Sequence, residues 1–243
     1  TSLSHGIYTD SAGVADVYAW GGQSEQSDTL GPYVRTGATT QTSPVLLPQG
    51  LTTGRDITGV NLFENVRKQG ALNLDGNSWA EVHDNASVDI TDAITLEAWV
   101  YWGIGSDEGI LGRWQTSGNK RSYILYKLND NNISFYISSD GTGANQDLVP
   151  FNVVIPDGWQ HIVGVYDGSN LKSYLNGSLT NSIATLLTEI DANDFYVEIG
   201  RYQNNIGNSF NNPIAQPRIY NRALTAEEVA RNYNNAKSIY TNS

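Results

Sequence analysis

Short runs of alternating apolar and polar residues recur along most of the chain. The clearest run covers 94–102, where apolar residues stand at every second position. Because side chains of a strand point alternately to opposite faces, this period of two predicts a strand. The same pattern predicts further strands at 71–74, 123–128, 133–138, 195–200 and 218–220. Many short strands separated by turn signals are typical of an all-β sandwich.

The segment 157–177 predicts a β-hairpin. Val163 and Val165 alternate with their neighbours in its first half, and Asp167-Gly168 follows as a turn. Asn176-Gly177 offers a second turn after the second strand. Asn-Gly and Asp-Gly accept the positive φ that type I′ turns require, so both strands have clear ends.

One helix is predicted near the C-terminus. Thr225 is its N-cap and Glu228 its third residue, which together form a capping box. Leu224 before the cap and Val229 in the first turn form the matching hydrophobic staple. A stripe of apolar residues on one face then predicts a structural role for this short helix: Ala226, Val229, Ala230 and Tyr233.

The N-terminal residues 1–55 differ from the rest of the chain. They are rich in Gly, Ser, Thr and Gln, and only 14–20 predicts a short strand. We therefore divide the chain into an N-terminal arm, 1–55, and one domain, 56–243. The arm either packs on its own domain or docks onto a neighbouring subunit.

The hairpin at 157–177 also resembles the W-x-H-(V/I)-x-V-x-Y-D-G…Y-x-N-G signature of laminin-G-like, concanavalin A-like jelly rolls. Segments at 70–76, 88–100, 197–201 and 218–228 resemble further pieces of that family in the family's order. Together they resemble a complete module of the bacterial and phage type. This resemblance implies a two-sheet antiparallel jelly-roll sandwich and a binding role, most often for carbohydrate.

The chain departs from this family at a position that can hold a structural Ca²⁺. Relatives usually carry Ile-Asp-Glu before the last strand, whereas this chain has Ile-Ala-Gln-Pro at 214–217. Asp75 stands at its own position, but a hard cation needs several oxygen ligands. We therefore expect no required cofactor, with a Ca²⁺ site built from backbone carbonyls as the alternative.

The composition restricts the partners. A net charge of −11 argues against nucleic acid and anionic membranes. Cysteine is absent, which excludes disulfides and thiolate metal sites, and no apolar run is long enough to insert into a membrane. Charged residues make up 16%, so the surface must be rich in Asn, Ser, Thr and Gln, as in many extracellular and virion β proteins.

The chain starts at Thr1 and shows no basic or apolar signal region there. Two settings fit this start: a virion component made in the cytosol, or a mature secreted domain. We expect a location on the virion surface, with a secreted location as the alternative.

An acidic run at 189–194 is the strongest enzyme signal. Glu189, Asp191 and Asp194 resemble the E-x-D-x-x-E strand of retaining β-glucanases, where two carboxylates flank the scissile bond. Here the last Glu is Asp, and the run lies in a predicted loop. The three histidines lie far apart and no Ser nucleophile motif accompanies them. We therefore expect no enzymatic activity.

A predicted loop at 112–123 gathers basic, aromatic and amide residues, among them Arg113, Lys120 and Arg121. Flat aromatic rings stack on sugars while amides supply hydrogen bonds, so this loop and a second one after Gly200 predict a glycan subsite. The alternative is two solvated loops with part of the aromatic surface in the core. The expected carbohydrate contacts are Trp114 and Tyr202 for stacking, with Asn119, Gln203 and Asn204 as hydrogen-bond partners.

These observations predict a non-catalytic carbohydrate-binding or adhesion module. Its expected setting is a phage virion surface or tail appendage that recognises a cell-surface polysaccharide. We expect it to form a homo-oligomer or to bind virion proteins through the arm at 1–55. A structural decoration or assembly protein is the first alternative, and a glycan hydrolase or lyase is the second.

Overall fold

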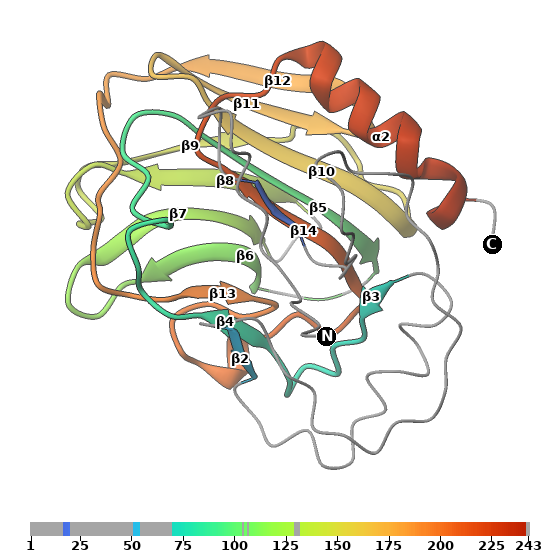
Figure 1. Cartoon of the computed structure of the whole chain (residues 1–243), viewed down its shortest axis with the longest axis horizontal. Coiled ribbons are helices and arrows are strands. Elements are labelled where there is room, and N and C mark those ends of the chain that lie inside the picture. The colour runs from blue at the N-terminus through green and yellow to red at the C-terminus, as the bar shows by residue number, and fades with distance from the viewer. Residues whose placement is uncertain are drawn as a thin grey trace, which may run out of the picture.

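Two antiparallel sheets stacked face to face form the molecule (Figure 1). The computed structural model describes residues 17–19, 51–53, 70–103, 105, 107–128 and 132–241. Each sheet has seven strands, and one α-helix follows the last strand. The structure therefore confirms the predicted all-β jelly-roll sandwich with a C-terminal helix.

The first sheet, sheet A, has the strand order β1-β14-β5-β10-β11-β12, with β3 also paired to β14. The predicted hairpin is β10-β11, in which Ile162 lies opposite Leu175. The bounds of the strands are β1 (Val17–Ala19), β3 (Ala71–Leu72), β5 (Ile94–Trp102), β10 (Gly158–Tyr166), β11 (Asn170–Leu175), β12 (Ser178–Ala184) and β14 (Ile214–Tyr220).

The second sheet, sheet B, has the order β2-β4-β13-β6-β7-β8-β9. A 3₁₀ turn, η1 (Ile206–Asn208), precedes β14. The bounds are β2 (Leu51–Thr53), β4 (Ala80–Val82), β6 (Glu108–Gln115), β7 (Lys120–Lys127), β8 (Ile133–Ser138), β9 (Gln146–Pro150) and β13 (Val197–Ile199).

The prediction of a loop at 112–123 is wrong. These residues form the end of β6, a tight turn and the start of β7. Gly112 is needed there for packing, because a Cβ on it would lie 2.6 Å from atoms of Ile124 on the neighbouring strand. A glycine that signals a loop in the sequence therefore marks a close strand contact in the structure.

Only two short pieces of the predicted arm lie within the described residues. β1 falls inside the strand predicted at 14–20 and pairs with β14, while β2 pairs with β4. The rest of the arm lies outside the described residues. The division into 1–55 and 56–243 stays a prediction.

The core fills the space between the two sheets. Leu96, Leu125 and Phe135 are fully buried there, each from the middle of its strand. Because side chains alternate along a strand, their neighbours point to the outer faces of the sheets. What covers each outer face decides where a ligand can bind.

Helix α2 (Ala226–Tyr240) covers the outer face of sheet A. It begins with the predicted capping box: Glu228 N–H donates to Thr225 Oγ1 at 3.3 Å, and Thr225 N–H donates to the Glu228 carboxylate at 2.9 Å. Leu224 and Val229 pack in one apolar cluster, which confirms the predicted staple. No helix of the described residues is long and apolar enough to cross a membrane.

The apolar stripe of α2 differs in part from the prediction. Ala226 is exposed, whereas Ala236 and Tyr240 are buried, because the helix runs past the predicted stripe. Tyr240 stacks on Trp99 of β5 with 4.6 Å between ring centroids, and Tyr233 stacks on the same ring at 5.6 Å. The helix therefore lies against aromatic side chains of the sheet along its second half.

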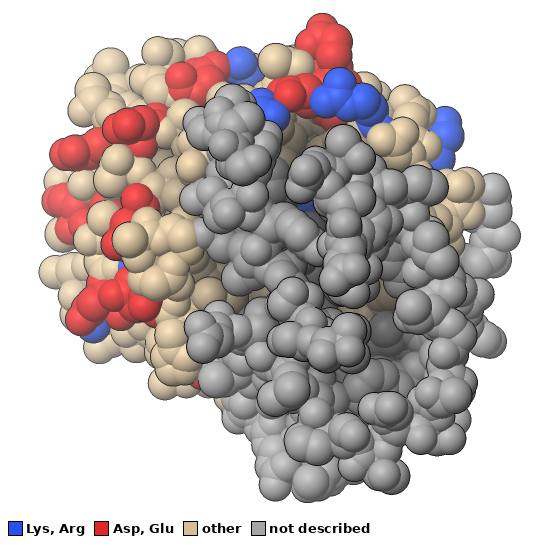
Figure 2. All heavy atoms as spheres, in the orientation of Figure 1, with Lys and Arg blue, Asp and Glu red and all other residues tan. Residues whose placement is uncertain are grey.

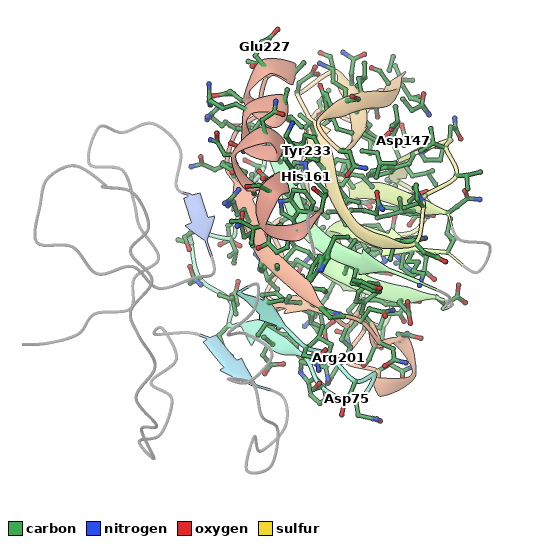
Figure 3. All side chains as sticks on the ribbon, turned by 90° about the vertical axis from the view of Figure 1, so that its right-hand side faces the viewer. Asp75, Asp147, His161, Arg201, Glu227 and Tyr233 are labelled. Atoms are coloured by element: carbon green, nitrogen blue, oxygen red, sulfur yellow. The ribbon has the colours of Figure 1, made fainter. Side chains whose placement is uncertain are left out.

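A buried carboxylate joins α2 to the strands beneath it. Glu97 of β5 is 1% exposed and accepts hydrogen bonds from Arg218 at 2.8 Å and Tyr220 at 2.9 Å of β14. Asn232 of the helix donates to it at 2.9 Å, and His161 Nε2 of β10 lies 3.0 Å from its other oxygen. Figure 3 shows His161 close to Tyr233 of the helix.

The partners of Glu97 keep it ionised. Burial by itself would raise the pKa of Glu97, but the hydrogen bond from His161 and the charge of Arg218 outweigh it and lower the pKa to about 2. Three strands and the helix thus converge on one buried negative charge.

Replacement of the N-cap should weaken the docking of α2. We expect Thr225→Ala to destabilise the protein by about 1 kcal/mol and to lower the melting midpoint by about 2–4 °C. Thr225→Ser keeps the acceptor oxygen and serves as the control. An unchanged midpoint in Thr225→Ala would show that the cap does not stabilise the domain.

Glu97 should make the free energy of unfolding decrease as the pH becomes acidic. Because its folded pKa is below the ordinary 4.5, its contribution is complete above pH 4.5 and is lost as the pH falls towards 2. We expect the urea-derived free energy of unfolding to fall less steeply in this window for Glu97→Gln than for wild type. The variant should also lose about 1–3 kcal/mol at pH 7, since Arg218, whose side chain is 22% exposed, loses its charged partner and the buried hydrogen bonds to Glu97 are weakened.

Glu189→Gln is the matched control, because Glu189 is an exposed carboxylate in the loop after β12. It should keep the wild-type pH profile. Identical profiles for Glu97→Gln and wild type would contradict the role given to Glu97.

Candidate binding face

The outer face of sheet B carries no helix in the part of the chain that the structure describes, since α2 packs on sheet A. Strand register identifies the residues in one row across this face. Its members lie opposite one another on neighbouring strands: Glu198, Gly112, Ile124, Tyr136 and Leu148. Their neighbours Tyr123 and Leu125 point into the core, so the row points outwards.

Four aromatic side chains form a continuous cluster on this side, and we name them the aromatic face: Trp114, Tyr126, Tyr136 and Tyr202. Neighbouring rings meet edge to face. Tyr136 lies 5.8 Å from Trp114 and 6.0 Å from Tyr126, while Tyr126 lies 4.9 Å from Tyr202. The three tyrosines are half-buried, so each keeps part of its surface exposed.

The environment disfavours ionisation of two tyrosines of the aromatic face, Tyr126 and Tyr136. Burial raises the pKa of Tyr126, and the hydrogen-bonded Tyr202 and the carboxylate of Asp107 raise it further. Burial also raises the pKa of Tyr136. The Tyr126 and Tyr202 hydroxyls are 3.2 Å apart. The face therefore combines apolar ring surface with neutral hydrogen-bonding groups.

The predicted role of Trp114 in sugar stacking is wrong. Trp114 is 6% exposed, and its ring meets the edge of Tyr136. It is a strand residue of β6 rather than a loop residue, which explains why its flat surface is covered. Trp114 therefore supports Tyr136 from the side and does not present a face to a ligand.

The structure brings the two predicted loops together beside the aromatic face. Gln203 N–H donates to the carbonyl oxygen of Trp114 at 3.1 Å, and Thr116 of the β6-β7 turn donates to Gln203 Oε1 at 2.8 Å. Tyr202, just before, is part of the aromatic face. Three of the predicted site residues thus lie in one neighbourhood although 88 positions separate Trp114 from Tyr202.

Asn204 and Asn119 lie at the margin of this neighbourhood. Asn204 is exposed, and its N–H donates to the carboxylate of Glu198 at 3.2 Å. Asn119 is exposed in the β6-β7 turn at φ 54°, and its N–H lies 3.4 Å from the carbonyl of Thr116. Their contact with a ligand stays a prediction, as it does for Tyr202 and Gln203.

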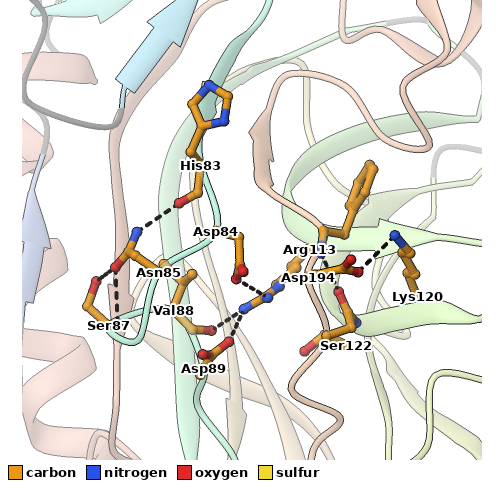
Figure 4. A network of polar contacts seen from close by, with 12 residues as sticks. His83, Asp84, Asn85, Ser87, Val88, Asp89, Arg113, Lys120, Ser122 and Asp194 are labelled. Atoms are coloured by element: carbon orange, nitrogen blue, oxygen red, sulfur yellow. Dashed lines mark hydrogen bonds and ion pairs between the residues drawn. The ribbon is translucent and has the colours of Figure 1, made fainter.

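The basic cluster expected at 112–123 is not a free cationic site. Arg113 is fully buried and points into the core, where it contacts Asp84 at 2.5 Å and Asp89 at 2.7 Å (Figure 4). Lys120 lies 2.8 Å from Asp194 (Figure 4). Two of the three expected cations are therefore neutralised by carboxylates distant in sequence.

The third cation, Arg121, is turned towards a neighbouring loop. Its side chain is half-buried and donates to the carbonyl oxygen of Gly141 at 3.2 Å. A backbone carbonyl does not neutralise its charge. Arg121 is thus the one member of the predicted basic cluster without a carboxylate partner among the described residues.

The guanidinium group of Arg201 holds a cluster of side chains beside the aromatic face. This cluster was not predicted from the sequence. Arg201 stacks on Trp79 at 3.7 Å, donates to Glu198 at 2.5 Å and lies 3.4 Å from Glu81. Burial raises the pKa of Glu198, although Arg201 acts in the opposite direction. The sequence signal was a Glu inside an apolar strand followed three residues later by Arg.

Glu198 and Glu81 lie directly opposite each other on β13 and β4. Two carboxylates at such spacing invite comparison with a retaining glycosidase pair. However, the Glu198 side chain is 1% exposed and is held by Arg201. A buried, clamped carboxylate cannot reach a glycosidic oxygen, so this pair has the features of a structural site.

The acidic run at 189–194 lies in the loop between β12 and β13, as predicted. The carboxylate of Asp191 accepts a hydrogen bond from Asn193 at 2.9 Å, and Asp194 lies 2.8 Å from Lys120. Glu189 is exposed. The three carboxylates do not line a sheet face, where the resembling glucanase pattern would require them.

The residues considered for Ca²⁺ make hydrogen bonds to protein groups, and the Ca²⁺ expectation stays a prediction. Asp75 accepts hydrogen bonds within its own turn, from Asn77 N–H at 2.9 Å and Ser78 at 2.8 Å. Gln216 accepts one from Arg218 at 2.7 Å, and that cation would oppose a metal ion. Within the described residues, no three His, Asp or Glu side chains are grouped to share a metal ion.

Comparison with known proteins places this geometry in context. A family model described as the concanavalin A-like lectin/glucanases superfamily matches residues 74–230. Among curated proteins, no sequence matches the chain.

Several solved binding domains share the fold. The binding domain of Paraclostridial Mosquitocidal Protein 1 is 18% identical, with a TM-score of 0.53 over 68% of this chain and 43% of that chain. Domain 4 of AbnA, a GH43 extracellular arabinanase from Geobacillus stearothermophilus, solved with arabinotriose, is 18% identical, with a TM-score of 0.53 over 66% and 75%. The Botulinum neurotoxin serotype G binding domain is 20% identical, with a TM-score of 0.52 over 67% and 41%.

This chain thus spans less than half of the toxin domains that it resembles. At such identities the likeness establishes the shared fold and nothing about the ligand.

Proposed function

The chain belongs to the concanavalin A-like lectin/glucanases superfamily, and from this premise we propose that it is a non-catalytic carbohydrate-binding module. The observation that carries the proposal is the aromatic face on the outer side of sheet B. Its three half-buried tyrosines offer ring surface and neutral hydroxyls side by side. Sugar rings need this combination, because they stack through CH groups and hydrogen-bond through hydroxyls.

The surroundings of the aromatic face add directional groups. Gln203 and Asn204 lie on the loop that follows Tyr202, and Asn119 and Thr116 lie in the facing β6-β7 turn. Amide side chains at the edge of an aromatic surface fix the orientation of a ligand. The arabinanase domain of the same fold was solved with arabinotriose, and we take a glycan as the ligand class of this chain as part of the proposal.

The absence of catalysis is part of the proposal. Glu198 and Glu81 are held by Arg201, and in the acidic run at 189–194 Asp191 is hydrogen-bonded to Asn193 and Asp194 is paired with Lys120. Neither set gives one protonated and one free carboxylate on opposite sides of an accessible bond, as glycoside hydrolysis requires. Binding is the activity that the geometry supports best.

We further propose that the module works on a virion surface or tail appendage, with a secreted location as the alternative. The low charged fraction of 16% supports an extracellular or particle setting. Attachment through residues 1–55 is part of this proposal. Immunogold labelling of purified particles would test the setting, and unlabelled particles would contradict it.

The aromatic face should control glycan affinity. A glycan array that includes arabino-oligosaccharides identifies a ligand, and calorimetry then measures its affinity for Tyr126→Ala and Tyr202→Ala. We expect each variant to bind at least tenfold more weakly, a change of about 1.4 kcal/mol, because a ring is removed from the stacking surface.

Tyr101→Ala is the matched control for this experiment, since Tyr101 is 43% exposed but belongs to β5 of sheet A. It should bind as wild type does. Equal loss of affinity in Tyr101→Ala, or no loss in the other two variants, would reject the aromatic face as the binding surface.

The protein should not cleave glycans. Reducing-end assays with laminarin, agarose and alginate, together with absorbance at the wavelength of unsaturated lyase products, should stay at background. The physical reason is that Glu198 is buried and paired. Turnover that Glu81→Gln or Glu189→Gln abolishes would contradict this prediction and restore the hydrolase or lyase alternative.

A further inference from the structure

Strand β12 is the free edge of sheet A. It is last in the strand order, and among the described residues β11 is its one strand partner. An edge strand presents a row of backbone N–H and C=O groups that another strand can pair with. The surface of β12 is therefore a place where the sheet can be extended.

Exposed apolar side chains gather on and just after β12. Leu179 is 53% exposed, Ile183 36% and Leu186 98%. The described residues have six exposed large apolar side chains, and these three lie within eight positions of one another. Single exposed apolar residues need no explanation, but a group on one edge is typical of an interaction surface.

The same segment lacks two of the features that protect edge strands. From Asn176 to Thr188 the sequence contains no charged residue and no proline. By contrast β9, one edge strand of sheet B, contains both Asp147 and Pro150. The register of β12 against β11 shifts once, between Asn181 and Leu179, so the regular stretch that another strand can pair with is Asn181–Ala184.

We propose that β12 pairs antiparallel with β12 of a second copy of this chain, so that the two A sheets become one continuous sheet. Antiparallel pairing of a strand with its own copy satisfies two-fold symmetry, because each copy offers the same groups to the other. With a net charge of −11, two copies repel each other over most of their surface. The uncharged segment at 176–188 is where they can approach.

Charge is unevenly distributed over the surface. Figure 2 shows acidic side chains gathered at the left-hand end of the sandwich. The one ion pair on the adjacent strand joins Lys172 to Asp167 at 2.6 Å and is neutral in sum. A strongly charged partner would find no complementary group on β12 itself, which favours a second copy over a basic or acidic protein.

The size of the edge limits the strength of the dimer. Seven paired residues extend about 23 Å at about 3.3 Å per residue. A standard interface buries about 800 Å² per partner, more than one strand edge and three apolar side chains supply. We therefore expect a reversible dimer whose population rises with concentration.

This dimer leaves the outer face of sheet B free in both copies, because β12 belongs to sheet A. If the proposed glycan function holds, the dimer carries two aromatic faces and binds surface polysaccharide with avidity. The dimer itself does not depend on that function.

Sedimentation velocity of the full chain tests the proposal. Wild type should change from monomer to dimer between low and high micromolar concentrations, and added salt should favour the dimer because it screens the net charge. Ile183→Lys and Leu186→Lys should stay monomeric under the same conditions. Leu186 is 98% exposed outside the strand, so its replacement cannot disturb the fold.

Val154→Lys is the control, because Val154 is 93% exposed in the loop before β10. It should dimerise as wild type does. Amide hydrogen exchange should also slow in β12 at high concentration. A wild type that is monomeric throughout, or lysine variants that still dimerise, would overturn the proposal, whereas a dimer without glycan affinity would reject only the proposed function.

Discussion

The buried carboxylate of Glu97 is the constraint on which the arrangement of the molecule depends. An ionised group inside a protein must be fully hydrogen-bonded, and the partners of Glu97 come from β10, β14 and α2. These bonds hold the helix on sheet A, where Trp99 adds stacking with Tyr233 and Tyr240. The outer face of sheet A is therefore closed, and function has to use the other sheet or the edges.

The aromatic face follows from this division. On sheet B the outward positions of β7 and β8 carry tyrosines where a solvated sheet would carry charged or small polar residues, and Tyr202 joins them from the loop after β13. Burial raises the pKa values of Tyr126 and Tyr136, which keeps these two side chains neutral in a chain of net charge −11. A neutral aromatic surface of this kind suits uncharged sugar rings better than ionic partners.

Much of the fold could be predicted from the sequence, because its signals are local. The alternation at 94–102 and 133–138 gives β5 and β8 with their observed bounds, and the cap at Thr225 gives the start of α2. The candidate site was harder to predict from the sequence, because it depends on strand register. Tyr126 and Tyr136 meet only once β7 pairs with β8, and the hairpin at 112–123 was hidden by glycines that serve close packing. Charge pairing was equally non-local, since the buried Arg113 of β6 contacts Asp84 and Asp89, which precede it by 29 and 24 positions and are partly exposed.

Nuclear magnetic resonance of ¹³C-labelled tyrosine during titration with a bound glycan tests the central claim most directly, namely that the open face of sheet B binds while α2 closes sheet A. Ring resonances of Tyr126, Tyr136 and Tyr202 should shift with increasing ligand. Those of Tyr220 beneath the helix and Tyr240 on its buried side, which are 6% and 2% exposed, should stay in place. Shifts confined to Tyr220 and Tyr240, with the aromatic face unchanged, would contradict the account.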